Sequence, residues 1–251
     1  MGKSLITFAL TAFLFLAVMQ PGTALASGQA EVRPDAPMKI LVGMESAYAK
    51  VDDYTANFLK RERVGGELLP EEDILLKFRK PFMVYMKWRE GPHGGREALY
   101  VQGKNSGKVV GHEGGFFGFI TLNMEPRGGI AMKGNRHPIT DVGIGRLIEI
   151  VMENTRRAGD DGALKFTYSG EEEVLGRNAY RIIEELPAGE DKGYYCRKLE
   201  LWVDKELGLP IKIIIYGWRD EILERYGYRD LKLNPGLSDS EFDRGYKDYG
   251  F

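Results

Sequence analysis

The sequence predicts an α+β fold, in which a long, curved antiparallel sheet forms an incomplete β-barrel and two main helices lie against its concave face. After residue 54 the apolar side chains alternate with a period of two over most of the chain, as in strands with one buried face. Short turns containing Gly or Pro separate these segments, so consecutive strands are expected to form hairpins. Only two segments show helical spacing, and each needs a sheet face to cover its apolar stripe.

The first helix is expected over residues 38–50, where Asp35 and Pro37 supply start signals. Its apolar residues recur at helical spacing, so one side of the helix must be buried. These residues are Ile40, Leu41, Met44, Ala47 and Tyr48.

Four strands are expected next, at residues 54–63, 72–80, 82–90 and 96–102. In the third of them, alternate residues divide into an apolar face and a mixed aromatic and basic face. The apolar face holds Phe82, Val84, Met86 and Trp88, and the opposite face holds Met83, Tyr85, Lys87 and Arg89. We expect the apolar face to contact one or both helices, and to line any ligand cavity between them.

Residues 103–138 have the least regular pattern of the chain. The stretch 111–119 places three Phe among four Gly. Gly gives the backbone conformational freedom, so the neighbouring Phe side chains either close over an apolar ligand or fill the protein core. Phe117 and Phe119 are therefore candidates for the mouth of a cavity, and core plugs are the alternative.

The second helix is expected over residues 141–157, with Thr140 or Asp141 as its cap and Gly159 at its end. The sheet then resumes with strands at 164–174, 178–187, 195–204, 209–217 and 221–231, which brings the total to about nine. Phe242 is expected to be the last ordered feature. We therefore expect a single domain over residues 37–242 and a polar C-terminal tail over residues 243–251.

The N-terminal segment has the order of a cleavable secretory signal. A charge at Lys3 precedes an uncharged apolar stretch, and Ala24-Leu25-Ala26 supplies the small residues of a cleavage site. The apolar stretch is shorter than the roughly 20 residues that cross a bilayer. We expect a signal peptide over residues 1–26, cleaved after Ala26, and a flexible lead-in over residues 27–36. The mature protein would then be periplasmic or otherwise exported.

Composition excludes some partners and leaves one Cys to explain. Removal of residues 1–26 from the 251-residue chain leaves 34 basic and 37 acidic residues, so no basic excess points to nucleic acid. Cys196 is the only Cys, so the chain has no internal disulfide, and the cleavage site has no Cys that could carry a lipid. Cys196 is expected to be buried and to pack like a small hydrophobic residue. We expect the protein to be a monomer.

Several motifs resemble a known family. Tyr-Thr-Ala-Asn-Phe-Leu-Lys-Arg-Glu-Arg-Val at 54–64, Arg-Glu-Ala-Leu-Tyr-Val at 96–101 and Met-Lys-Gly-Asn-Arg-His-Pro-Ile-Thr-Asp-Val-Gly-Ile-Gly at 132–145 resemble the uncharacterised bacterial domain-of-unknown-function family 1571. The stretches 201–212 and 228–234, with Phe242, resemble the wider superfamily of outer-membrane lipoprotein carriers. The second resemblance implies an incomplete β-barrel that folds around helices and holds acyl chains between them.

We therefore expect an exported cell-envelope protein that binds a lipid, lipoprotein or other apolar ligand without a covalent bond. An open curved sheet covered by amphipathic helices can leave an apolar hollow, although a fully packed interior is the alternative. Two other functions stay open. One is an interaction module for an envelope partner, and the other is a hydrolase that uses the loops carrying His93, His112 and His137.

Catalytic and metal motifs are missing from the sequence. There is no His-Glu-x-x-His and no Gly-x-Ser-x-Gly, and the Gly-rich run 103–108 is one residue too short for a phosphate loop. We expect no catalytic residues, no metal and no cofactor. Arg136 is a candidate for binding a carboxylate or phosphate head group at the mouth of the hollow, because its planar fork gives bidentate contacts. Alternatively, Asn135 and Arg136 pin the loop that enters the second helix.

Overall fold

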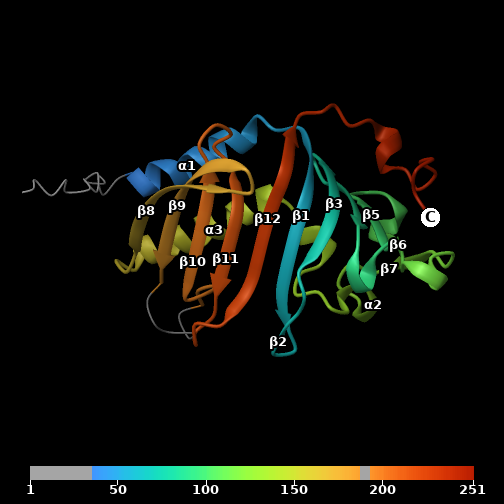
Figure 1. The fold of residues 1–251 in the computed structure, drawn as a ribbon, viewed down its shortest axis with the longest axis horizontal. Helices are drawn as coiled ribbons and strands as arrows, with labels where there is room; N and C mark the ends of the chain where they lie inside the picture. Colours follow the sequence, from blue (N-terminus) through green and yellow to red (C-terminus); the bar gives the residue numbers. More distant parts are fainter. Residues whose placement is uncertain (1–35, 187–192) are drawn as a thin grey trace, which may run out of the picture. The chain divides into compact units, whose positions relative to one another are not determined.

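The computed structural model describes residues 36–186 and 193–251, apart from the side chain of Phe117. Strands of this part of the chain form one antiparallel sheet of twelve strands (Figure 1). Their order is β7-β6-β5-β4-β3-β1-β12-β11-β10-β9-β8, with β2 paired to β1. The sheet ends at β7 and β8 without closing, as predicted. The expected signal peptide and its cleavage site lie outside the described residues.

All nine strands expected from the sequence are present, with ends that differ by a few residues. The strands are β1 (Asp53–Val64), β2 (Glu67–Leu68), β3 (Glu72–Arg79), β4 (Met83–Trp88), β5 (Glu97–Val101), β6 (Val109–His112), β7 (Leu122–Met124), β8 (Lys165–Val174), β9 (Arg177–Glu185), β10 (Lys198–Asp204), β11 (Pro210–Tyr216) and β12 (Ile222–Leu233).

The pairing of β1 with β12 joins the two halves of the chain at the centre of the sheet. Strands β3 to β7 extend from β1 on one side, and β11 to β8 extend from β12 on the other. The pair is irregular near Asn57, whose side-chain amide donates a hydrogen bond to Asp230 at 2.6 Å. The contact of Asn57 with Asp230 joins residues that are 173 positions apart in the sequence.

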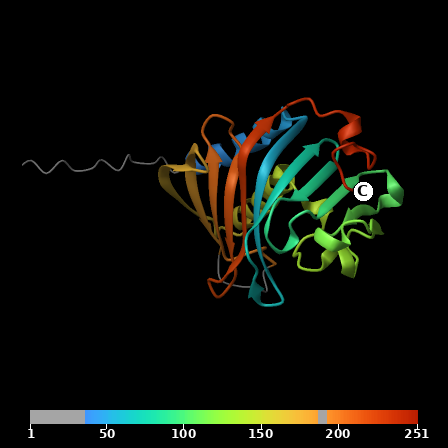
Figure 2. The same ribbon diagram turned by 45° about the vertical axis from the view of Figure 1, so that its right-hand side comes forward.

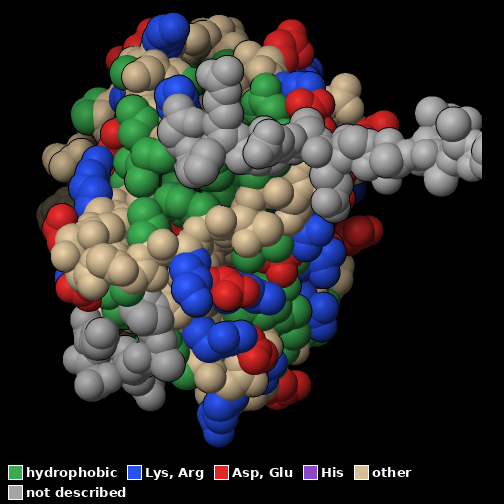
Figure 3. Space-filling view, turned by 90° about the vertical axis from the view of Figure 1, so that its left-hand side faces the viewer, with side chains coloured by type: hydrophobic (Ala, Val, Ile, Leu, Met, Phe, Trp, Pro, Cys, Tyr) green, Lys and Arg blue, Asp and Glu red, His purple; other side chains and the backbone are tan. Residues whose placement is uncertain are grey.

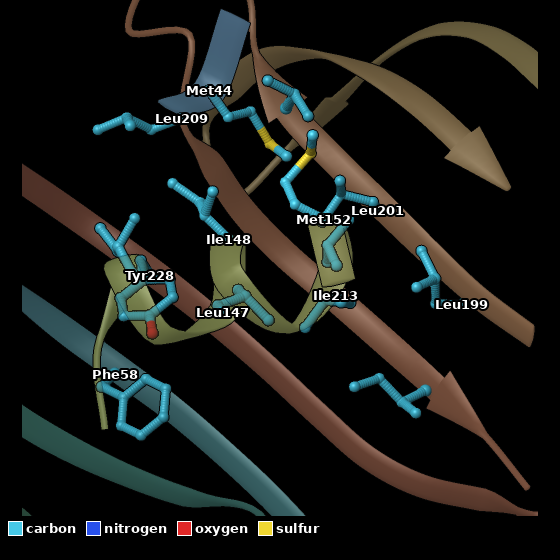
Figure 4. Close-up of a cluster of buried hydrophobic side chains, with 14 of the residues drawn as sticks. Met44, Phe58, Leu147, Ile148, Met152, Leu199, Leu201, Leu209, Ile213 and Tyr228 are labelled. Carbon is cyan, nitrogen blue, oxygen red and sulfur yellow. The ribbon is translucent and has the colours of Figure 1, made fainter. Parts of the chain in front are cut away.

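Helices α1 (Ala36–Ala49) and α3 (Ile144–Asp160) cover the concave face of the sheet. Figure 4 shows Leu147, Ile148 and Met152 of α3 directed toward Ile213 and Leu201 of the sheet, with Met44 of α1 beside them. Burial of each such side chain contributes about 1.5–3 kcal/mol, so this layer is the main source of stability. Val84, Met86 and Trp88 lie in the same buried cluster as the helix residues, and Phe82 packs against it. The predicted apolar face is therefore confirmed.

Helix α3 begins three residues later than predicted, and neither Thr140 nor Asp141 caps it. Residues Ile139–Asp141 form a separate 3-10 turn, and Gly143 is the N-cap. Gly143 has φ +120°, and a Cβ there would lie 2.9 Å from the hydroxyl of Tyr54. That hydroxyl accepts a hydrogen bond from the backbone N–H of Ile144 at 3.1 Å. A distant side chain thus replaces the local cap, because Gly allows the close approach.

The segment 103–138 is more ordered than the sequence indicated. It contains β6, β7 and the short helix α2 (Gly129–Met132), so the sheet extends beyond β5. In this segment the apolar runs are too short and too interrupted by Gly for periodicity to reveal them.

The order of the chain also continues past Phe242, which is not the last ordered residue. Tyr249 stacks on Tyr85 of β4 with ring centroids 3.7 Å apart, and Phe251 lies edge-on to the same ring. Phe242 is buried in a second cluster with Tyr85, Leu99 and Val110. The tail 243–251 therefore lies on the convex face, which is the face predicted to be mixed aromatic and basic.

The surface carries both signs of charge side by side. Figure 3, which looks at the end of the sheet where α1 and β8 lie, shows Lys and Arg beside Asp and Glu. Arg156 and Glu45 form one such pair at 2.6 Å, and Lys205 pairs with Glu171.

No helix within the described ranges is long and apolar enough to cross a membrane.

Candidate functional site

A cavity of about 460 Å³ lies between the concave face of the sheet and the segment from β7 to the first turns of α3. Strands β1, β4, β5, β6, β11 and β12 supply one side, and α2 with residues 139–150 supplies much of the other. Figure 2 brings forward the side of the molecule where β7 and α2 lie. The volume is within the range of about 300–1,000 Å³ that small-molecule pockets occupy.

Much of the cavity wall is apolar. Met86 and Trp88 come from the predicted apolar face of β4, and other apolar side chains come from β1, β5, β6, β11, β12 and residues 139–150. These include Phe58, Ala98, Val109, Ile139, Val142, Leu147, Ile150, Ile215 and Tyr228. Such a wall suits a hydrocarbon chain, because each methylene transferred from water contributes about 0.8 kcal/mol.

One part of the wall is polar and is built on the central strand pair. On β1, Phe58, Lys60 and Glu62 point to the same face, and on β12 their cross-strand partners are Tyr228, Tyr226 and Glu224. Lys60, Glu62 and Glu224 are all buried. Charged groups this deep are stable only when they are paired, so their partners determine what the site can do.

Lys60 is held by two hydrogen bonds and an ion pair. Its Nζ lies 2.7 Å from Glu72 Oε2, 2.8 Å from Asn135 Oδ1 and 3.5 Å from Glu62 Oε2. Glu72 is held in turn by Trp88, whose Nε1 donates to Oε1 at 2.8 Å. Asn135 also donates from Nδ2 to the carbonyl of Ala131 in α2 at 3.0 Å. Lys60 therefore ties the loop after α2 to the sheet.

Glu224 receives three donors on one oxygen. Arg136 Nε donates to Oε1 at 2.7 Å, His137 Nε2 lies 3.0 Å from the same atom, and the hydroxyl of Tyr195 also donates to it. The backbone N–H of Arg136 donates to Glu62 Oε2 at 2.7 Å, and the Tyr226 hydroxyl donates to Glu62 Oε1 at 2.5 Å. Arg136 thus binds both buried carboxylates.

This network shifts the pKa of its members. Burial raises the pKa of Glu224, but the hydrogen bonds and charges of His137 and Arg136, with the Tyr195 hydrogen bond, outweigh it and bring the pKa below its usual value. Burial lowers the pKa of His137, but the hydrogen bond and charge of Glu224 outweigh it and raise the pKa. Glu224 is therefore ionised at neutral pH, and His137 has a greater tendency to carry a proton than a free His.

The described residues contain no group of three His, Cys, Asp or Glu side chains that could hold a metal ion. His93 lies 4.0 Å from Glu113, and His112 Nδ1 bonds the carbonyl of Glu113 at 2.8 Å, whereas His137 belongs to the Glu224 network. Cys196 is buried, and burial raises the pKa of its thiol to about 12, which leaves it unreactive at neutral pH.

The structure brings together only some of the residues that the sequence singled out. Met86 and Trp88 line the cavity, whereas Val84 and Phe82 belong to the packed core. Phe119 is 75% exposed, so it is not a core plug; the side chain of Phe117 lies outside the described atoms.

Arg136 is ion-paired with Glu224, and it is absent from the described wall of the cavity. Asn135 and Arg136 hold the loop before α3 in place, which is the structural alternative weighed from the sequence.

Sequence reasoning missed Lys60, Glu62, Glu224 and Tyr226. A signal was present, because Lys60 and Glu62 continue the period-two face that begins with the apolar residues Ala56 and Phe58. A charge on the inward side of a strand must find a buried partner or a ligand.

Exposed apolar side chains gather beside the cavity. Leu122 and Ile130 line the cavity and are also 43% and 69% exposed. Phe116, Phe119 and Ile120 lie in the loop that leads into β7, and the rings of Phe116 and Phe119 pack edge to face with centroids 6.2 Å apart. We call these five residues the apolar rim.

An open antiparallel sheet with helices on its concave face and a cavity between them defines an incomplete β-barrel with an internal cavity. The chain belongs to the family described as "Protein of unknown function (DUF1571)", whose model matches residues 51–251. The family predicted from the sequence motifs is confirmed. The sequence matches no curated protein.

The chain is similar to several solved structures at low sequence identity. The similarity to MucB has a TM-score of 0.50 at 14% identity and covers 83% of this chain, which spans 62% of the MucB chain. The similarity to lipoprotein LppX of Mycobacterium tuberculosis has a TM-score of 0.49 at 13% sequence identity. It covers 82% of this chain and 99% of LppX. The similarity to a LolA superfamily protein of Nitrosomonas europaea has a TM-score of 0.35 at 12% sequence identity. It covers 83% of this chain and 98% of the Nitrosomonas protein.

Proposed function

We propose that this protein is exported to the cell envelope and binds a lipid, an acylated protein or another apolar ligand in the cavity, without a covalent bond. The observation that carries the proposal is the cavity of about 460 Å³ with apolar residues from both the sheet and α3. Protein interiors are close-packed, so a space of this size with a largely apolar wall favours an occupant.

The way the cavity is covered supports a ligand that enters and leaves. Apart from the first turns of α3, the cover consists of α2, a helix of four residues, and short loops. Side-chain contacts tie this region to the sheet, with Arg96 bidentate on Glu113 at 2.9 Å and Lys60 Nζ donating to Asn135 Oδ1 at 2.8 Å. Segments with few buried contacts open more readily than the core, so the sheet and α3 need not unfold for a ligand to pass.

Export rests on the N-terminal segment, whose charged start, apolar stretch and small residues at 24–26 are typical of a cleaved signal. N-terminal sequencing of the protein from the envelope of an expressing bacterium tests this, with Ser27 as the expected first residue. Recovery of the intact N-terminus in a membrane fraction would contradict it.

Native mass spectrometry of the protein purified from a bacterial envelope tests the binding function. We expect added mass from a co-purified lipid, and saturable uptake of a fluorescent fatty acyl probe after delipidation. A delipidated protein that is folded and takes up neither the probe nor a lipid extract would contradict the proposal.

An interaction module for an envelope partner is the second candidate, because the apolar rim exposes Phe116 and Phe119 beside the cavity. MucB has been solved in complex with MucA(peri). A partner captured at the rim by a protein whose cavity stays empty would favour this candidate over a carrier.

A further inference from the structure

We propose that the polar part of the cavity is a head-group subsite for amphiphiles whose heads donate hydrogen bonds, such as ammonium or hydroxyl groups, and that it disfavours anionic heads. This inference rests on the proposed function and adds to it the chemical class of the ligand. It is built on Glu224, Glu62, Lys60 and Tyr226, which all line the cavity.

The first observation is an acceptor that the protein leaves available. All three donors to the Glu224 side chain, from Arg136, His137 and Tyr195, converge on Oε1. Within the described residues Oε2 accepts no hydrogen bond, although only 1% of Glu224 is exposed. A buried carboxylate oxygen on a cavity wall gains most from a donor, because a charge-assisted hydrogen bond is about twice as strong as a neutral one.

The second observation is that the Lys60 ammonium group and the Tyr226 hydroxyl are already engaged. Lys60 Nζ donates hydrogen bonds to Glu72 and Asn135 and is ion-paired with Glu62 at 3.5 Å. The hydroxyl of Tyr226 donates to Glu62. An anionic head would therefore lie beside buried carboxylates, and the Lys60 ammonium group next to them is already paired.

The charges point the same way. Three carboxylates, Glu62, Glu72 and Glu224, face the two permanent cations Lys60 and Arg136, and only a proton on His137 makes the numbers equal.

The other two Lys or Arg residues of the cavity wall do not alter this balance. Arg96 is engaged by Glu113, and Lys133 is exposed, where solvent screens its charge. A cationic or neutral donor is thus the complementary head.

The test compares three amphiphiles with the same dodecyl-length chain: an alkylammonium, a monoacylglycerol and a carboxylate. Each is titrated near neutral pH against the delipidated wild-type protein that holds a fluorescent acyl probe, at concentrations below micelle formation. Because the chain contribution is the same for all three, differences report the head. We expect the ammonium and glyceryl compounds to bind about tenfold tighter than the carboxylate.

A pair of variants assigns the preference to the subsite. Glu224→Gln should reduce the ammonium-to-carboxylate preference by about tenfold. Glu200→Gln should leave it unchanged, because Glu200 is a buried carboxylate held by Arg181 at 2.6 Å on β10, away from the described cavity wall. The wild-type ranking needs no variant, so it decides the matter if Glu224→Gln does not fold.

The outcomes separate the two proposals. Binding of all three compounds with equal affinity, or tighter binding of the carboxylate, would overturn the head-group subsite and leave the apolar cavity function standing. Failure of all three to displace the probe, together with no uptake of the probe itself, would overturn the proposed function and the subsite with it.

Discussion

Glu62 and Glu224 are direct cross-strand neighbours on β1 and β12, although both are buried carboxylates. Like charges placed opposite each other weaken a sheet. Here Arg136 offsets the repulsion, because its backbone N–H binds Glu62 and its side chain binds Glu224, each at 2.7 Å. The loop before α3 is therefore part of what makes the central strand pair stable.

Replacing Arg136 with Met should lower the free energy of unfolding by about 1–3 kcal/mol. Loss of one partner of a fully buried pair costs about 3–5 kcal/mol, and Arg136 is one-third exposed, so the effect should be smaller. Urea unfolding measures it. Arg146→Met is the control, because Arg146 pairs with Glu149 on the surface and should change stability by less than about 1 kcal/mol. Equal effects of the two variants would contradict the bridging role.

The apolar rim should matter for ligand uptake and not for folding. Because Phe116 and Phe119 are 84% and 75% exposed, the double variant Phe116→Ser, Phe119→Ser should change stability by less than about 1 kcal/mol. Uptake of the acyl probe should weaken. A core plug would behave oppositely, with a loss of about 3–5 kcal/mol for each Phe. The control for a general surface effect is Val42→Ser, because Val42 is an exposed apolar residue on α1. Unchanged uptake by the double variant would show that Phe116 and Phe119 take no part in ligand binding.

Filling the cavity should weaken binding while the fold is kept. Ala98 of β5 lines the cavity, so Ala98→Leu places extra methyl groups where a ligand chain would lie. Displacing about two methylenes of ligand corresponds to roughly a tenfold loss of affinity. The midpoint of urea unfolding should stay nearly constant, because the new side chain enters open space. The comparison variant is Ala49→Leu at the exposed end of α1. If both variants bind the probe like the wild type, the ligand does not occupy this space.

Glu184 should make stability fall as pH rises. It is completely buried on β9, one of its oxygens has no partner within the described residues, and burial raises its pKa from 4.5 to about 7 despite a hydrogen bond from Thr155. The native state thus holds a proton that the unfolded state releases at lower pH. This contribution is complete below about pH 4.5 and is lost by about pH 7, with a total of roughly 3 kcal/mol.

Urea unfolding at several pH values between these limits measures how the free energy of unfolding depends on pH. Glu184→Gln should make this dependence weaker. Glu185→Gln, an exposed neighbour on the same strand, should keep it. His137 also has a raised pKa, but its contribution falls only above its unfolded value of 6.5, so the lower part of the range isolates Glu184. If the free energy of unfolding depends on pH as strongly in Glu184→Gln as in the wild type, other groups cause the dependence.

The C-terminal tail should contribute to stability through Tyr249. Its ring lies 3.7 Å from that of Tyr85, and its hydroxyl donates to the carbonyl of Glu241 at 2.6 Å. Tyr249→Ala should therefore cost about 2 kcal/mol in urea unfolding. Lys247→Ala, at an exposed position of the same tail, should be neutral. A tail that does not pack in solution would give the two variants the same stability.

The sequence by itself determined nine of the twelve strands, the two main helices and which side of β4 is buried. Val84, Met86 and Trp88 point inward and Tyr85 points outward because side chains alternate along any strand, and this alternation needs no knowledge of the neighbouring strands. The family motifs likewise lie within single segments. Such features depend on residues a few positions apart, so they can be predicted from the sequence.

Only the tertiary structure decided where the polar part of the cavity wall and the cavity itself lie. The opposition of Glu62 and Glu224 follows from the pairing of β1 with β12, and the approach of Asn135 to Lys60 follows from the path of a loop without clear periodicity. These contacts join residues between 75 and more than 160 positions apart, and no local pattern specifies the partner. Lys60 and Glu62 lie at inward positions of β1, so the sequence indicates that each needs a partner of opposite charge or a hydrogen-bonding group. Which residues are those partners depends on the fold, because a buried charge is stable only when it is paired.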